Sequence, residues 1–135
     1  MAKKLSLKKP AGNSSELNAL IIDAIQDIKG KNIIQLDLRS LDDAPADYFI
    51  ICEGDSSTQV RAISENIGKK IKDKTGVKPY HTEGIDGAKW ILVDFFDTVV
   101  HVFYPETRAF YEIEELWGDA KITQFEIAIF IQQDI

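Results

Sequence analysis

The sequence predicts an α/β (α+β) fold, in which helices pack on a mixed β-sheet. Helical and strand patterns follow one another in the order α-β-β-α-β-β-β-α, which is typical of layered folds. The segment Asp47–Gly54 is apolar almost throughout, as expected of a central strand that is buried on both faces. A length of 135 residues suits one domain, and no internal repeat is present.

The first predicted elements are a basic arm, a helix and two strands. Residues 1–14 contain four lysines and no acidic residue, a composition that predicts disorder. The helix begins at the serine pair 14–15, which can cap it, and repeats apolar residues at helical spacing until Gly30 ends it. The β-branched run 33–38 predicts a strand, and a turn containing Pro45 leads from it to the apolar strand.

A second helix and a weaker strand follow. The segment 56–76 keeps one apolar face, crowds lysines at its C-terminal end and closes at a glycine, which predicts an amphipathic helix. The face consists of Val60, Ile63, Ile67 and Ile71. Residues 77–81 predict a third, weaker strand, and residues 82–89 predict a glycine-containing loop.

The last third of the chain predicts a hairpin and short helices. The strands 89–95 and 98–104 are joined by a tight turn near 96–97. Residues 105–121 predict one or two short helices, and the apolar tail 122–135 predicts an extra strand or helix whose packing partner the sequence does not indicate. We therefore divide the chain into a disordered basic arm at 1–14, a folded domain at 15–120 and a C-terminal extension at 121–135.

Composition and charge argue against several classes of protein. No apolar run approaches the about 20 residues that a membrane helix needs, and the basic N-terminus lacks the apolar core of a secretory signal. The single cysteine, Cys52, cannot form an intrachain disulfide, which favours a reducing, cytoplasmic setting. Ten acidic and three basic residues between Glu83 and Glu126 leave a net charge of −7. Such a surface repels nucleic acid phosphates, and it either favours a basic partner or simply aids solubility.

Two aspartates and a histidine in the hairpin are candidates for metal binding or acid–base catalysis. Side chains alternate along a strand, so Asp94 and His101 could approach each other across the hairpin, near Asp97. Two ligands fall short of the three protein ligands of a catalytic zinc site. We therefore favour a structural hydrogen bond between His101 and an aspartate over a metal site.

A second candidate is the strand–Gly–Ser–helix segment 54–59, because the N-terminus of a helix can hold an anion. It lacks a Walker pattern, and no Asp-x-Asp pair follows on the next predicted strand to hold magnesium. A helix cap is the favoured interpretation. Cys52 lies in a strand predicted to be buried. We expect no catalytic residue, no metal and no cofactor, and hence no enzyme.

The hairpin instead offers apolar residues to a partner. Phe95 and Phe96 occupy a turn, where Asn, Asp and Gly are preferred, so we expect them to be covered by the tail or exposed for a partner. Trp90 is a residue type that anchors interfaces, although packing beneath the final helices against Trp117 is an alternative. Aromatic residues surrounded by aspartates suit a cationic protein surface, and burial of the hairpin in a homodimer is the competing interpretation.

Several motifs in fixed order resemble the ribosomal silencing factor family, also called Iojap-like or RsfS. The resemblance covers roughly residues 17–120 and rests on DYFIICEGDSSTQVRAIS and WILVDFFDTVVHVFYPETRAFYEIEELWGDA. Its signature positions are Asp47, Gly54, Ser56, Ser57, Gln59, Trp90 to Asp94, Val99, Val100, His101, Arg108, Tyr111, Leu116, Trp117, Asp119 and Ala120.

The resemblance implies a nucleotidyltransferase-like fold without nucleotidyltransferase activity. It implies binding to the large ribosomal subunit through its protein fourteen, at the face that docks the small subunit, so that subunit joining is blocked when nutrients are short. In organelles, relatives act in large-subunit assembly. From the charge and the lack of a long apolar run, we expect no direct sequence-specific contact with nucleic acid and no membrane association.

On this basis we expect a partner-binding surface on the hairpin and the helix after it. Trp90, Phe95 and Phe96 would anchor the partner, Asp94 and Asp97 would set orientation and association rate, and His101 and Arg108 would order the hairpin and the following helix. The full set is Trp90, Asp94, Phe95, Phe96, Asp97, His101, Arg108 and Tyr111. Phe96 departs from the family, which commonly has glycine at this position of the turn.

Overall fold

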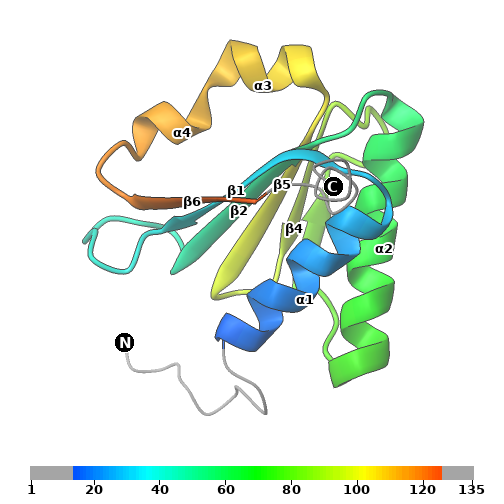
Figure 1. The fold of residues 1–135 in the computed structure, drawn as a ribbon, viewed down its shortest axis with the longest axis horizontal. Coiled ribbons are helices and arrows are strands. Elements are labelled where there is room, and N and C mark those ends of the chain that lie inside the picture. The colour runs from blue at the N-terminus through cyan, green and yellow to red at the C-terminus, as the bar shows by residue number, and fades with distance from the viewer. Residues whose placement is uncertain (1–13, 126–135) are drawn as a thin grey trace, which may run out of the picture.

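Ten helices and strands follow one another along residues 14–125, the part of the chain that the computed structural model describes (Figure 1). They are, in order, α1 (Ser14–Asp27), β1 (Lys31–Asp37), β2 (Tyr48–Glu53), α2 (Ser57–Thr75), β3 (His81–Glu83), β4 (Trp90–Asp94), β5 (Thr98–Phe103), α3 (Pro105–Tyr111), α4 (Ile113–Leu116) and β6 (Lys121–Phe125).

The strands form one mixed sheet in the order β3-β4-β5-β2-β1-β6. Only β2 and β5 run parallel, and every other neighbouring pair is antiparallel. The predicted fold class is therefore confirmed. The prediction that the apolar run 47–54 is a central strand is also confirmed, because β2 lies between β5 and β1 with five of its six residues buried.

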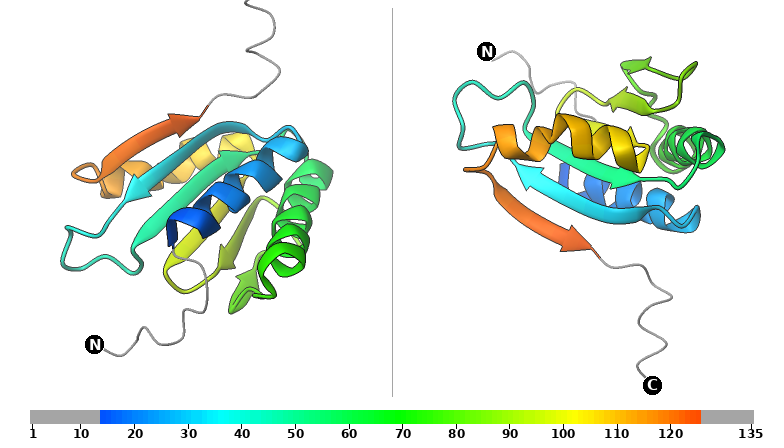
Figure 2. Two further views of the ribbon diagram at one scale, coloured as in Figure 1. Left: turned by 60° about the horizontal axis from the view of Figure 1, so that its bottom comes forward. Right: turned by 90° about the horizontal axis from the view of Figure 1, so that it is seen from above.

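Helices cover both faces of this sheet, and strand alternation divides the core into two clusters. α1 and α2 pack on one face, where Ile91 and Val93 of β4 and Cys52 of β2 lie in the first cluster. α3 and α4 lie across the other face, where Phe103 of β5 and Phe49 of β2 lie in the second cluster. Figures 1 and 2 show the two pairs of helices on opposite sides of the sheet.

The long helix ends as its sequence predicts. Ser56 caps α2 by accepting a hydrogen bond from the backbone N–H of Gln59, and Gly76 follows α2 in the left-handed conformation with φ of 80°. Glycine adopts this conformation without steric cost. None of the helices within residues 14–125 is long and apolar enough to cross a membrane.

The third strand is the element whose position was predicted wrongly from the sequence. The prediction was residues 77–81, but β3 spans His81–Glu83 and pairs with β4 through His81 opposite Asp94. Pro79 lacks the N–H that a ladder requires, which explains why pairing starts only after it. Part of the apolar tail is a strand, since β6 pairs with β1, whereas residues 126–135 and the arm at 1–13 lie outside the described residues.

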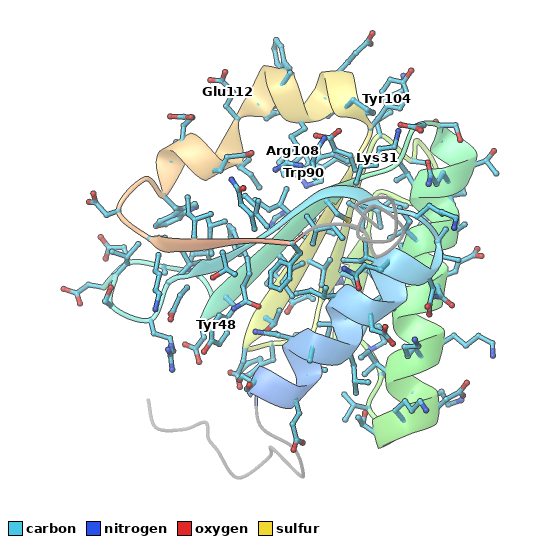
Figure 3. All side chains as sticks on the ribbon, viewed as in Figure 1. Lys31, Tyr48, Trp90, Tyr104, Arg108 and Glu112 are labelled. Carbon is cyan, nitrogen blue, oxygen red and sulfur yellow. The ribbon has the colours of Figure 1, made fainter. Side chains whose placement is uncertain are left out.

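Arg108 joins the α3–α4 layer to the sheet from inside the molecule (Figure 3). Its side chain is only 10% exposed. It donates to Glu53 of β2 at 3.1 Å, to Glu114 of α4 at 3.0 Å and to the backbone carbonyl of Asn32 at 2.8 Å. The β1–β2 register shifts between Lys31 and Ile34, and Asn32 lies within this irregularity with φ of 51°. The guanidinium therefore connects two strands and two helices.

We predict that Arg108→Ala lowers the free energy of unfolding by about 3 kcal/mol, because two poorly exposed carboxylates lose their cation. Arg39→Ala is the matched control, since Arg39 also forms paired hydrogen bonds with a carboxylate, that of Asp37, but its side chain is 60% exposed. The control should cost much less, because solvent screens an exposed ion pair. Urea unfolding of both variants measures the difference, and equal losses would contradict the structural role of Arg108.

Candidate functional site

The helical layer of α3 and α4 leaves part of β4 uncovered. Burial along β4 alternates, with Ile91 and Val93 buried on the α1–α2 side and Trp90, Leu92 and Asp94 half-buried on the other. Tyr111, at the end of α3, is 52% exposed and its ring lies 5.0 Å from that of Trp90. We call the surface formed by Trp90, Leu92, Asp94 and Tyr111 the open face.

Trp90 is held in one orientation within the open face. Its ring stacks on Phe103 at 4.9 Å, and its indole N–H donates to Nδ1 of His101 at 3.1 Å. Since Nδ1 accepts, the neutral imidazole carries its proton on Nε2. Burial lowers the pKa of His101 to about 4, so the ring is neutral near pH 7 and remains an acceptor for Trp90. Figure 3 shows Trp90 beneath α3.

The predicted hydrogen bond between His101 and an aspartate does not form. His101 lies opposite Leu92, whereas Asp94 lies opposite Val99. Asp94 instead accepts the backbone N–H of Phe96 at 2.7 Å and so closes the turn. Trp90 supplies the partner that we expected from an aspartate. Among residues 14–125, no group of three His, Cys, Asp or Glu side chains is placed to hold a metal ion.

The turn between β4 and β5 is strained at Phe96. Its φ is +82°, and the N–H of Asp97 donates to the carbonyl of Phe95 at 3.1 Å, a bond that spans two residues as in a γ-turn. A side chain in this region costs about 1–2 kcal/mol relative to glycine. The ring of Phe96 is nevertheless 53% exposed and contacts Tyr80 edge to face at 6.1 Å.

The two phenylalanines of the turn differ in burial. We expected both to lie outside the core, covered by the tail or exposed for a partner, and this is wrong for Phe95. Phe95 is 7% exposed and packs in the cluster beneath α1 and α2. It lies two positions after Val93, so the strand alternation continues one residue past the end of β4 and directs both side chains to the same face.

The remaining expected residues differ in how much surface they present. Asp94 and Tyr111 belong to the open face, and Asp97 lines a pocket beside the turn. His101, 4% exposed, and Arg108 lie inside the molecule, where they hold Trp90 and the α3–α4 layer in place. Trp90 packs against Tyr111 rather than Trp117, which instead contacts Phe49 at 6.3 Å.

Four residues with apolar surface were absent from the predicted set. Leu92 shares the face of Trp90, and the alternation of the strand was the signal that could have identified it. Tyr80 contacts Phe96 and lies just before β3. The predicted strand at 77–81 included Tyr80, so its place beside the turn was not expected. Phe110 is 78% exposed and Leu116 is 73% exposed on the helical layer. Their helices are too short for periodicity to separate a buried face from an exposed one.

The glycine–serine segment before α2 is occupied by the chain's own groups. Ser56 accepts the N–H of Gln59 at 3.1 Å, and the side-chain oxygen of Gln59 accepts the N–H of Asp55. The carboxylate of Asp55 pairs with Lys31 at 2.9 Å. These contacts are those of a helix cap. Cys52 is fully buried, which raises the pKa of its thiol to about 12 and leaves it protonated near neutral pH.

Comparison with known proteins gives consistent matches. A family model described as ribosomal silencing factor during starvation matches residues 11–134. The ribosomal silencing factor RsfS of Halalkalibacterium halodurans is 38% identical over 114 residues, which are 84% of this chain and 96% of that protein. The mitochondrial assembly of ribosomal large subunit protein 1 of Mus musculus is 41% identical over 73 residues, 53% of this chain and 32% of that protein. A crystal structure from Chromobacterium violaceum superposes with a TM-score of 0.76 at 39% identity, and the match covers 87% of this chain and 97% of that one.

We predict that Phe96→Gly raises the free energy of unfolding by about 1 kcal/mol, because glycine adopts the positive φ of the turn without steric cost. Phe96→Ala is the control, since alanine removes the same ring but keeps the strained backbone. Thermal or urea unfolding of the two variants measures the effect. If Phe96→Gly is no more stable than Phe96→Ala, the turn does not store strain at this residue.

We predict that the protein loses stability as the pH falls from 6.5 to 4, because burial keeps His101 neutral in the folded chain. In this window the unfolded chain protonates His101 at its ordinary pKa of 6.5, whereas the folded chain resists until about 4. Unfolding is therefore favoured by up to about 1.4 kcal/mol per pH unit. The carboxyl groups of Asp27 and Asp37 have pKa values below the ordinary 3.8, so the stability that they contribute is lost only at lower pH.

The control for this prediction is His101→Asn, whose side-chain oxygen takes the place of Nδ1 and can still accept from Trp90 but does not titrate. Urea unfolding across the same pH window should show a much flatter dependence for this variant than for the unmodified protein. The absolute stability of the variant is not the readout, because the substitution also changes core packing. Equal slopes for the two proteins would show that His101 is not the titrating group.

Proposed function

The chain belongs to the ribosomal silencing factor family, and from this premise we propose that it binds the large ribosomal subunit through its protein fourteen and blocks joining of the small subunit. Occupation of the joining face lowers translation when nutrients are short. The protein acts in the cytoplasm as a binding factor, and no bond is made or broken.

The observation that carries this proposal, beyond family membership, is the open face. It presents a Trp90 ring whose orientation is fixed by stacking and by a hydrogen bond to His101. A side chain that is ordered before binding loses little conformational entropy when a partner covers it. Tyr111 extends the aromatic surface, and Asp94 borders it. Aromatic residues at the centre of a patch with charged residues at its edge are typical of protein interfaces.

The charge of this region favours a cationic protein as the partner. Residues 83–126 carry a net charge of −7, and Arg108, one of the three cations, is neutralised within the molecule by Glu53 and Glu114. Glu83 of β3 lies opposite Leu92, which adds a second carboxylate beside the open face. A negative surface of this kind accelerates association with a positively charged protein and disfavours phosphate groups.

The absence of catalysis is part of the proposal, and the contacts of each candidate group support it. Ser56 caps α2, Cys52 is buried within β2, and His101 accepts from Trp90. Ser56 therefore has a structural role, and Cys52 and His101 are shielded from solvent within the core. A nucleotidyltransferase-like enzyme is the less favoured alternative.

Action in large-subunit assembly is a second candidate function. It is favoured by the similarity to the mouse protein, whose name describes mitochondrial assembly of the ribosomal large subunit. Purified mature subunits distinguish the two functions. Inhibition of joining between mature subunits supports silencing, whereas binding restricted to incomplete large particles supports assembly. Homodimerisation through the open face is also compatible with its apolar residues and would compete with ribosome binding.

We predict that Tyr111→Ala weakens binding to large subunits about thirtyfold, the effect of losing a central aromatic contact worth about 2 kcal/mol. Tyr111 is the suitable position because its ring is half exposed, so truncation leaves most of the core intact. Ile85→Ala is the matched control, because Ile85 is also exposed, at 47%, but lies in the loop that Arg61 of α2 contacts.

Co-sedimentation with purified large subunits measures affinity, and the fraction of joined ribosomes measures the steric block. The unmodified protein should bind and reduce joining, and the control variant should behave like it. If Tyr111→Ala and a folded Trp90→Ala both bind as tightly as the unmodified protein, the open face is not the interface. If the unmodified protein fails to bind large subunits at all, the proposed function is wrong.

A further inference from the structure

A pocket of about 450 Å³ lies beside the strained turn, between it and the 38–47 connection. Its apolar lining includes Leu41, Pro45, Tyr80 and Phe96, and four carboxylates also line it. These are Asp42, Asp47, Asp94 and Asp97. The pocket thus combines apolar walls with a cluster of negative charge.

The walls of the pocket are fixed by backbone hydrogen bonds. The carbonyl of Asp97 accepts from the N–H groups of both Asp47 and Tyr48, at 2.9 and 3.0 Å, which joins the 38–47 connection to the turn. The N–H of Tyr80 donates to the carbonyl of Asp94 at 2.7 Å and holds the third wall. The shape of the pocket is therefore set before any ligand enters it.

The electrostatics of the pocket favour a cation. Arg39 is the one basic residue in its lining, and its guanidinium is engaged by both oxygens of Asp37, at 2.9 and 2.7 Å. Asp42 and Asp47 are exposed at the rim of the pocket. Lysine suits such a site, because its ammonium binds carboxylates while its four-carbon stem packs on apolar walls.

The N-terminal arm of the chain is attached next to this pocket. α1 begins at Ser14, and one turn later the side-chain oxygen of Asn18 accepts the hydroxyl of Thr98 at 2.7 Å. Thr98 directly follows Asp97 of the pocket wall. In Figure 1 the start of α1 and the turn between β4 and β5 lie at the same end of the sheet. The point at which the arm joins α1 therefore lies close to the turn that carries Asp97.

The arm has the composition that the pocket requires. Residues 3–9 read KKLSLKK, four lysines around two leucines, and residues 1–13 contain no acid. Leu5 and Leu7 are two positions apart, the spacing that directs two side chains to one side of an extended segment. Four residues, and hence five Cα–Cα steps, separate Lys9 from Ser14. These steps span at most about 18 Å when extended, so tethering keeps the lysines at an effective concentration of about the millimolar range.

We propose that the pocket beside the turn binds residues 3–9 of the same chain, with lysine ammonium groups on its carboxylates and the leucines on its apolar walls. The occupant follows from charge complementarity and from the position at which the arm joins α1. The contact is electrostatic in large part, and it is therefore sensitive to salt. It does not depend on ribosome binding.

Paramagnetic labelling of the full-length protein tests this proposal. A spin label is attached to Lys4→Cys, and selective labelling is expected because the thiol of Cys52 is buried with its pKa raised to about 12. In an isotope-labelled sample, the backbone amide signals of Ala46, Tyr80 and Phe96 should lose intensity. Signals of Phe103 and Ser57, at the opposite end of the strands, should not.

Two controls make the result specific. Asp42→Asn with Asp47→Asn removes two rim carboxylates and should restore the intensities. Asp43→Asn with Asp86→Asn removes the same charge from residues outside the pocket lining and should leave the effect unchanged. Raising the salt concentration from about 0.1 M to about 1 M shortens the screening length from about 10 Å to about 3 Å and should also restore the signals.

Three outcomes would overturn the proposal. The first is unchanged intensity at Ala46, Tyr80 and Phe96 in the labelled protein. The second is loss of intensity that persists when Asp42 and Asp47 are both replaced. The third comes from a mixed sample, in which spin-labelled copies without isotopes are combined with isotope-labelled copies without the spin label. The same loss of intensity in this sample would mean that the arm binds a second copy and not its own chain.

Discussion

Arg108 donates from inside the molecule to Glu53, Glu114 and the carbonyl of Asn32, and these bonds determine where α3 and α4 lie on the sheet. The two helices are short, with seven and four residues, whereas α1 and α2 on the other face have 14 and 19. A layer of this size cannot cover six strands. Because the guanidinium holds it over β2, part of β4 stays uncovered, and the open face lies there.

The fold class and most elements could be predicted because they depend on local patterns. Local patterns identified β1, β2, β4, β5 and both long helices within a few residues. These patterns are apolar runs, serine and glycine at helix ends, and two-residue alternation in strands. The predictions for the site residues were wrong where burial or a hydrogen bond depends on residues that are distant in the sequence. Arg108 lies 55 positions from Glu53 and 76 from Asn32, and the acceptor for Trp90 is His101 on the neighbouring strand. Phe95 is buried and Phe96 is exposed because the alternation of the strand continues for one residue beyond the end of β4. This difference could not be predicted once both residues were assigned to the turn.

Phe96 shows a conflict between backbone conformation and side chain that the chain has retained. A positive φ favours glycine, and the resemblance to the family indicates glycine at this place. The phenylalanine nevertheless presents half of its ring to solvent and meets the ring of Tyr80. A strained backbone and an exposed apolar ring do not stabilise the fold. A contact of the ring outside the core explains better why phenylalanine is found here. The strained turn, the pocket beside it and the open face occupy one continuous region of the molecule.

Asp94 connects these features, because it belongs to the open face, closes the turn by accepting the N–H of Phe96 and lines the pocket. A cationic partner that extends along β4 as far as Asp94 would therefore meet the same carboxylate that the proposed arm contact uses. A tethered arm competes at a fixed effective concentration, so only a partner with more positive charge or more apolar contact than KKLSLKK displaces it. A partner that binds only Trp90, Leu92 and Tyr111 would not experience this competition. The chain is positively charged before α1 and negatively charged after β3. For a partner that extends to Asp94, this division of charge links binding at the open face to occupancy of the pocket by the arm.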